Sequence, residues 1–235
     1  MKRIVLVLLA VLAVACWLPG QAAHADTAIS LTSGYLTTAT GNNFGIAATG
    51  AWAGASPAGF KIEWEVTAIT GGFHYEYDIS DAGGGGLNKD LSHIILQISN
   101  DAVLADFSNF STPYTTGDPT PYSTSGSSGS NPNMPNPIYG FKFTPTTDPE
   151  KALFTIEFDS TRAPTWGNFY AKDGNAGPVT AWNLGLADPS STNAYAFISV
   201  PDTKTVVPLP GALLLLGGGL VRLAAYSRRK RQFAA

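Results

Sequence analysis

Cysteine is almost missing from this 235-residue sequence: the single one, Cys16, lies in an apolar stretch near the N-terminus. Once that stretch is set aside the chain has no thiol, which excludes disulfides, cysteine-ligated zinc and a cysteine nucleophile. Charged residues are also scarce, at 13%, and the formal net charge of −3 shows no basic excess. A nucleic-acid binder is therefore excluded. The apolar share of 44% excludes a wholly disordered chain.

The N-terminus has the layout of a secretory signal peptide. A positively charged start is followed by an apolar run at 4–18 and then by Ala23 and Ala25, which form a small-x-small cleavage site. We expect cleavage after Ala25, so that residues 1–25 are a signal peptide and the protein is exported. A competing interpretation is a lipobox, in which Cys16 is lipidated and becomes the new N-terminus.

The C-terminal end carries a second apolar segment. Residues 206–226 form a run of 21 residues, long enough to cross a bilayer as a single hydrophobic helix. Arg222 and three consecutive glycines make it a weak permanent anchor. The basic cluster that follows favours a cytoplasmic end. This cluster consists of Arg228, Arg229, Lys230 and Arg231.

The same tail begins with a proline-containing motif made of Val207, Pro208, Leu209, Pro210 and Gly211. A short motif, a weak membrane segment and an Arg-rich end together resemble the PEP-CTERM sorting signal in its VPLPA-type variant. The resemblance covers residues 207–235 and departs from the common pattern at Leu209, Gly211 and Arg222. It implies that an exosortase-type membrane enzyme recognises the motif and processes the tail, in bacteria that make extracellular polysaccharide.

Between these ends, residues 26–206 carry all of the acidic charge. Seven basic and 17 acidic residues give this region a net charge of 7 − 17 = −10. An acidic exported domain avoids nucleic acid and anionic lipid and can attract divalent cations. The chain therefore divides into a signal peptide (1–25), an exported domain (26–206) and a sorting tail (207–235).

The exported domain is patterned as β-strand throughout. Apolar and polar residues alternate over 60–66 and 73–79, and the glycines between these runs predict a hairpin. Many short strands, Gly/Pro turns and no amphipathic helix predict an all-β fold, an antiparallel β-sandwich of the jelly-roll or immunoglobulin-like type. Further strands are expected at 29–37, 44–51, 94–99, 139–144, 153–159, 168–171 and 195–200.

Residues 111–137 interrupt the strand pattern. Of these 27 residues, 23 are Pro, Gly, Ser, Thr or Asn, and none is Lys or Arg. Such a segment buries too little apolar surface to order itself, so we expect an exposed loop. We favour a surface insertion between two strands over a spacer between two subdomains, because each flank alone has too few strands to close a sandwich.

A loop rich in aspartate follows the second strand of the hairpin. Asp78, Asp81, Asn88 and Asp90 surround four consecutive glycines, and such loops can supply the oxygens that calcium needs. The spacing does not match an EF-hand, so a polar hairpin loop with turn-forming Asp and Asn is the simpler interpretation. No cofactor is expected apart from this possible calcium ion.

Two histidines remain after removal of the leader, His74 and His93. Together with Glu76 they would bind zinc if their strands were adjacent, but no spacing fixes that distance. We therefore interpret both histidines as solvated residues on strand faces.

Aromatic residues crowd one stretch of the C-terminal half. Trp166 and Tyr170, together with Trp182, could form a carbohydrate-stacking platform, because aromatic rings offer flat apolar faces. Arg162 or Lys172 could lie over one of these rings. The alternative is a core strand that ends in a turn.

No catalytic constellation stands out. Glu63 and Glu65 face the same way on one strand, whereas a glycosidase needs two carboxylates about 5–10 Å apart across a cleft. We expect a secreted or cell-surface, non-catalytic protein of the extracellular polysaccharide or biofilm matrix, held transiently in the inner membrane by its tail. Its expected partners are an exosortase and exopolysaccharide. A carbohydrate-binding module and a surface hydrolase are the alternatives.

Overall fold

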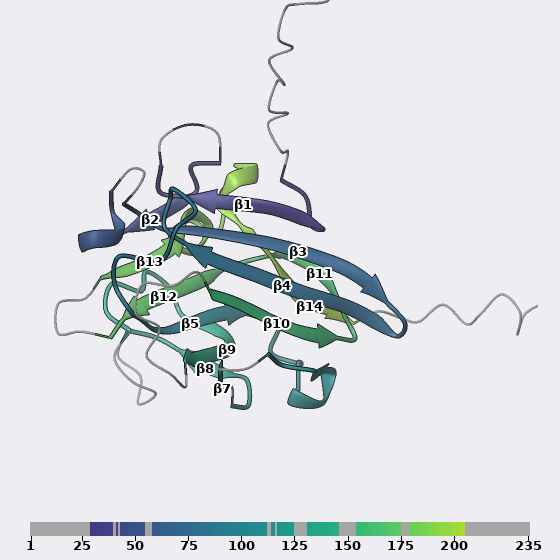
Figure 1. Cartoon of the computed structure of the whole chain (residues 1–235). Coiled ribbons are helices and arrows are strands. Elements are labelled where there is room, and N and C mark those ends of the chain that lie inside the picture. The colour runs from purple at the N-terminus through teal and green to yellow at the C-terminus, as the bar shows by residue number, and fades with distance from the viewer. Residues whose placement is uncertain are drawn as a thin grey trace, which may run out of the picture.

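Antiparallel strands make up about half of the residues that the computed structural model describes, which are 29–39, 41, 43–54, 58–111, 114–115, 117–124, 131–145, 154–174 and 179–204. Figure 1 shows two groups of strands lying over one another, with the long strands β3 and β4 in one and β5, β9 and β12 in the other. The first group is a five-stranded sheet in the order β1 (Ser33–Thr37), β3 (Lys61–Ile69), β4 (Gly72–Ser80), β10 (Phe154–Ser160) and β6 (Phe107–Ser108).

A seven-stranded sheet forms the second group. Its order is β2 (Ile46–Ala48), β13 (Thr180–Asn183), β12 (Phe169–Asp173), β5 (Leu91–Gln97), β9 (Ile138–Pro145) and β7 (Tyr114–Thr115), and β8 (Thr120–Tyr122) also pairs with β9. Two further strands, β11 (Arg162–Gly167) and β14 (Ile198–Lys204), pair with each other. The described helical turns are η1 (Gly50–Trp52), η2 (Leu104–Asp106), α2 (Leu184–Ala187) and η3 (Ala194–Ala196).

The predicted all-β, antiparallel class is confirmed, and so is the predicted hairpin. Strands β3 and β4 pair from Lys61 opposite Ser80 to Ile69 opposite Gly72. A two-residue turn joins them, and its second residue, Gly71, has a φ of 89°. Side chains disfavour this left-handed backbone, which explains why glycine occupies the turn.

Alternation of side chains decides which face of the hairpin is buried. Ile62, Trp64 and Val66 of β3 point inward, while the intervening glutamates are exposed. Trp64 lies opposite Tyr77 of β4, and Val66 lies opposite Tyr75. A period of two therefore places these large apolar side chains on one face of the sheet.

Aromatic rings from both sheets meet in one core. Phe158 of β10 stacks on Phe143 of β9 with ring centroids 5.8 Å apart. Phe107 of β6 meets Phe141 of β9 edge-on at 4.5 Å. These four residues belong to a single cluster of buried side chains that draws on both sheets. Burial of such large rings is the main contribution to the stability of the fold.

The β11–β14 pair is joined to the core by tyrosine hydroxyls. The Tyr75 hydroxyl donates to the carbonyl of Arg162 and the Tyr77 hydroxyl donates to the carbonyl of Ser199, each at 2.9 Å. Burial raises the pKa of both tyrosines, so both hydroxyls remain protonated donors. The inner face of β4 is thereby fixed to β11 and β14 as well as to its own sheet.

The expectation of one exposed loop at 111–137 is wrong for its described part. Strands β7 and β8 lie within it and pair with β9. Asn131 and Met134 are buried. The segment orders because the outer face of the larger sheet supplies apolar surface that its own composition lacks. The buried apolar side chains on this outer face form a second cluster, which consists of Ile95, Tyr122, Met134, Ile138, Tyr170 and Leu186.

Five strands have no counterpart in the sequence prediction: β6, β7, β8, β11 and β13. Strand β11 contains Pro164, and its register with β14 shifts between Ala163 and Pro164. Proline ordinarily argues against a strand, but it is tolerated at such an irregularity. The strand predicted at 44–51 is shorter than expected, since β2 ends at Ala48 and is followed by η1.

No helix among the described residues is long and apolar enough to cross a membrane. The predicted signal peptide and the predicted C-terminal hydrophobic helix lie outside the described residues.

Candidate functional site

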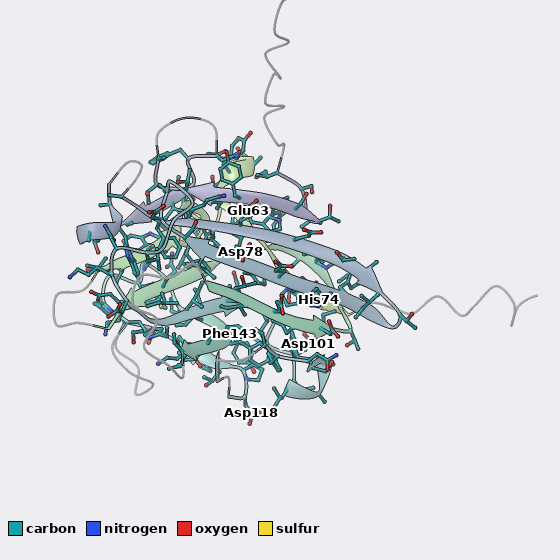
Figure 2. All side chains as sticks on the ribbon, viewed as in Figure 1. Glu63, His74, Asp78, Asp101, Asp118 and Phe143 are labelled. Carbon is teal, nitrogen blue, oxygen red and sulfur yellow. The ribbon has the colours of Figure 1, made fainter. Side chains whose placement is uncertain are left out.

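Carboxylates gather on the outward face of the five-stranded sheet. The register places Glu76 of β4 between Glu65 of β3 and Glu157 of β10. His74 lies one row away, opposite Asp159. Figure 2 labels Glu63, His74 and Asp78 on these strands. We call this surface the acidic face; its carboxylates are Glu63, Glu65, Glu76, Asp78, Glu157 and Asp159.

Glu76 experiences the crowding of this surface. Partial burial raises the pKa of its carboxyl group, and the negative charges of Asp78, Glu157 and Glu65 raise it further. Like charges on neighbouring strands disfavour the ionised form, whereas a cation placed among them would favour it. A positive charge at the centre of the acidic face would therefore be stabilised by the surrounding carboxylates.

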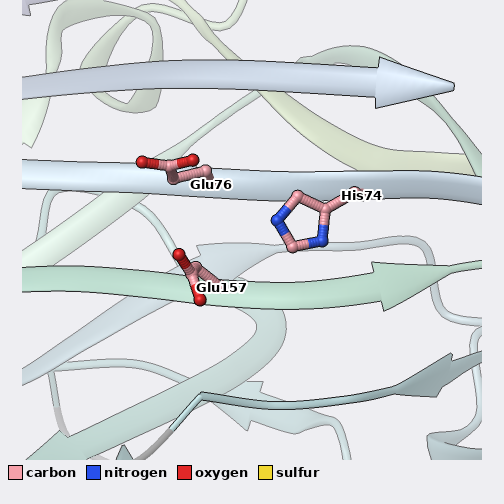
Figure 3. Close-up of side chains that lie close together, drawn as sticks. All are labelled: His74, Glu76 and Glu157. Carbon is pink, nitrogen blue, oxygen red and sulfur yellow. The ribbon is translucent and has the colours of Figure 1, made fainter.

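Three side chains of the acidic face converge on one point. One potential ligand atom from each of His74, Glu76 and Glu157 lies within 4.8 Å of the other two. Figure 3 shows the ring nitrogen of His74 that is farther from the backbone turned toward the two glutamates. Strand β4 supplies two of these residues and β10 supplies the third. We call this group the His74 cluster.

The other ring nitrogen of His74 is occupied. Nδ1 lies 2.7 Å from Oδ1 of Asp159, so it donates to that carboxylate in the tautomer that leaves Nε2 as an acceptor. The Asn109 side-chain amide donates to Oδ2 of Asp159 at 2.6 Å. These hydrogen bonds, first from Asn109 and then from His74, lower the pKa of Asp159 and keep it ionised.

A shallow depression of about 200 Å³ adjoins the cluster toward β1. Its lining includes Tyr35, Glu63, Trp64 and Asp78, and Lys61 pairs with Glu63 at its rim. The carboxylates in it are spread over an open sheet surface. They do not face one another across a deep cleft, which is the arrangement that a glycosidase requires.

The four residues proposed for calcium do not converge. Asp78 lies on β4 and accepts from the Thr155 hydroxyl of β10. Asp81 is satisfied within its own turn, because its Oδ1 accepts from the backbone amides of residues 83 and 85, each at 2.8 Å. The Asn88 side chain donates to the carbonyl of Ala51. Asp81 therefore stabilises a turn at 81–85, and Asp90 lies just before β5.

The three proposed platform residues do not form one surface, because Tyr170 and Trp182 are paired across β12 and β13 whereas Trp166 lies on β11. Trp166 on β11 is 41% exposed and rests edge-on against buried Trp64, with ring centroids 6.2 Å apart. Tyr170 is fully buried and its hydroxyl donates to the carbonyl of Pro132. Trp182 is partly buried against the second cluster of the larger sheet. A platform of all three is therefore wrong, and Trp166 is the member that presents a ring to solvent.

His93 is not a solvated residue, contrary to the prediction. It is 3% exposed on the larger sheet, and its Nε2 lies 2.9 Å from Oδ1 of Asn131. Burial, together with the charges of Lys142 and Lys172, lowers its pKa to about 4. His93 and His74 lie on different sheets, so a zinc site containing both is also wrong.

Arg162 does not lie over an aromatic ring. Its guanidinium is 1% exposed and pairs with Asp101 at 2.7 Å and with Asp106 at 3.1 Å. It also donates to the Ser99 hydroxyl and to the carbonyl of Asp202. This buried cation therefore ties β11 to the 99–106 segment and to β14.

Glu157 and Asp159 were not among the residues predicted for any site. The alternating pattern predicted their strand and identified the outward-facing positions, but pattern alone does not show that β10 pairs with β4. The residues of the cleavage site, of the sorting motif and of the basic cluster lie outside the described residues. Comparison of the chain with family models, curated proteins and solved structures finds no match.

Proposed function

We propose that this chain is an exported, non-catalytic protein of the cell surface or the extracellular polysaccharide matrix, sorted by processing of its C-terminal tail. The observation that carries the proposal is the position of the motif at 207–211. Two residues separate it from the end of β14 at Lys204. Such a short connection would hold the β-structure near the outer face of the inner membrane, where an exosortase-type enzyme can reach the motif.

The same proposal includes a β-sandwich architecture. Support comes from the aromatic core shared by the two sheets, in which β10 contacts β9 through Phe158 and Phe143. A rigid, antiparallel and strongly acidic sandwich suits a structural component outside the cell, where net charge keeps a protein soluble.

Changing the sorting motif should block release of the protein. We expect a Pro208→Ala, Pro210→Ala double variant, expressed in a polysaccharide-producing host with its own exosortase, to stay in the membrane fraction with its tail attached. The unchanged chain should appear at the surface or in the medium without the tail. Immunoblotting of fractions with antibodies against the tail and the β-domain separates these forms. Equal release of both chains would contradict processing at this motif.

Carbohydrate binding is a second candidate function, supported by the position of Trp166. An indole that is 41% exposed and held edge-on by Trp64 has the fixed orientation that stacking against a sugar ring requires. The neighbouring strand β14 holds the backbone of Trp166 through its pairing with Ser199.

A Trp166→Ala variant tests this candidate. We expect at least about a fivefold loss of affinity for the host polysaccharide, since losing one stacked ring costs about 1 kcal/mol or more. Phe44→Ala is the matched control, because Phe44 is 44% exposed and lies elsewhere on the surface. Affinity electrophoresis in gels containing the polymer provides the measurement. If neither the unchanged chain nor the control is retarded, the carbohydrate-binding candidate is wrong.

A further inference from the structure

We infer that the His74 cluster is a binding site for a divalent transition metal ion of the zinc class. Its three potential ligand atoms lie within 4.8 Å of one another. Zinc bonds to imidazole nitrogen and carboxylate oxygen at about 2.0–2.2 Å, which places tetrahedral ligand atoms about 3.4 Å apart. The cluster would therefore need to close by only about 1 Å, which rotation of the two glutamate side chains can supply.

The contact between His74 and Asp159 supports a metal ligand independently of this convergence. A histidine that binds metal through one ring nitrogen usually donates the other N–H to a carboxylate, which fixes its tautomer and orientation. Here Nδ1 lies 2.7 Å from the Asp159 carboxylate, and Nε2 points to Glu76 and Glu157 (Figure 3). Asn109 holds Asp159 from its other side. Asp159 is thus a positioning residue for the histidine.

The backbone frame beneath the cluster is rigid. Glu76 and Glu157 are direct register partners, and His74 pairs with Asp159 in the same β4–β10 ladder. The opposite side of this ladder is packed in the core through buried Tyr75 and stacked Phe158, whose ring centroids are 5.4 Å apart. Ligands carried by paired strands in a packed sheet are held more accurately than ligands on loops.

The types of ligand in the His74 cluster favour zinc-like ions over calcium. One imidazole and two carboxylates suit zinc and its neighbours, whereas calcium takes six to eight oxygen ligands. Two glutamates balance the charge of a divalent ion, and Glu65 and Asp78 add to the attraction from adjacent positions. The His74 side chain is 36% exposed, so the ion would have a fourth coordination position open toward solvent.

Isothermal titration of the tag-free, full-length protein with zinc chloride tests the inference. We expect one ion per chain, and at least tenfold weaker binding by His74→Gln and Glu157→Gln. Asp159→Asn should bind about 10–100-fold more weakly, because it loses the carboxylate that orients the imidazole. Cobalt(II) added in place of zinc should give the visible absorption bands that are typical of a four-coordinate ion in the unchanged chain and not in His74→Gln.

Glu63→Gln is the matched control, because it removes one negative charge from the same face without touching the three ligands. It should bind zinc as tightly as the unchanged chain. If Glu63→Gln and Glu157→Gln weaken binding equally, zinc is attracted by the general charge of the acidic face and the site is wrong. Absence of saturable zinc binding by the unchanged chain, or calcium binding of equal strength that Glu157→Gln also abolishes, would overturn it too. Thermal unfolding of each variant verifies folding, and these solvent-facing changes should leave it intact.

Discussion

An Arg162→Met variant is expected to lose about 3–5 kcal/mol of unfolding free energy, because removing the buried cation leaves the largely buried carboxylate of Asp106 without its charge partner. The guanidinium is 1% exposed and contacts Asp101 and Asp106. Methionine fills much of the same volume but donates no hydrogen bond. The melting temperature should fall by about 10 °C for a domain of this size.

The reason for so large an effect is that one side chain connects three parts of the chain. Arg162 begins β11, and its donors reach η2 at Asp106 and the carbonyl of Asp202 on β14. Without it the carboxylate of Asp106 would remain largely buried beside an apolar side chain. An Arg162→Lys variant should recover only part of the loss, since an ammonium cannot reproduce the forked geometry of the guanidinium.

Lys61→Met is the control for this prediction. It removes a cation from a surface ion pair with Glu63, and exposed pairs contribute at most about 1 kcal/mol. Urea unfolding followed by tryptophan fluorescence measures both variants. If the unfolding free energy of Arg162→Met lies within about 1 kcal/mol of that of the unchanged chain, the buried ion pairs of Arg162 do not stabilise the fold as proposed.

Acidification below pH 6.5 should destabilise the protein through His93, by about 3 kcal/mol at pH 4. The folded state lowers the pKa of His93 to about 4 by burial and by the nearby charges of Lys142 and Lys172. In the unfolded chain the ordinary pKa is about 6.5. Between these values the unfolded state binds the proton more strongly, so the free energy of unfolding falls as the pH falls.

A His93→Gln variant isolates this contribution. Glutamine stays neutral and keeps a donor for Asn131, so its unfolding free energy should depend less on pH, even where its stability at pH 7 is lower. Carboxylates contribute equally to both proteins, and the difference between the two urea-unfolding series therefore reports His93. Parallel pH profiles from 7 to 4 would contradict the placement of a neutral, buried histidine.

The hairpin was predictable because its pattern is local. Alternating residues over 60–66 and 73–79, with Gly71 in the turn, specify two adjacent strands and their buried faces without any distant information. Strand β11 was not predicted because Pro164 breaks the pattern, and β13 was not predicted because four residues carry too little periodicity. The buried part of 111–137 depends on a sheet face that its own composition does not reveal.

The candidate site depends on pairing between strands far apart in the sequence. His74 and Glu76 are two residues apart and their common face is a local property, but Glu157 reaches them only through the register of β10 against β4. Burial of His93 likewise depends on Asn131, which comes from the segment predicted to be exposed. The residue types and their strand faces could therefore be predicted from the sequence, but the strand pairing that brings them together could not.

The intact mass of the protein recovered from the cell surface or medium of an exosortase-containing host tests the functional proposal most directly. We expect a chain that begins at Asp26 and ends at or near the 207–211 motif, without the apolar segment and the basic cluster. A mature surface protein that retains Arg228–Arg231 would contradict it.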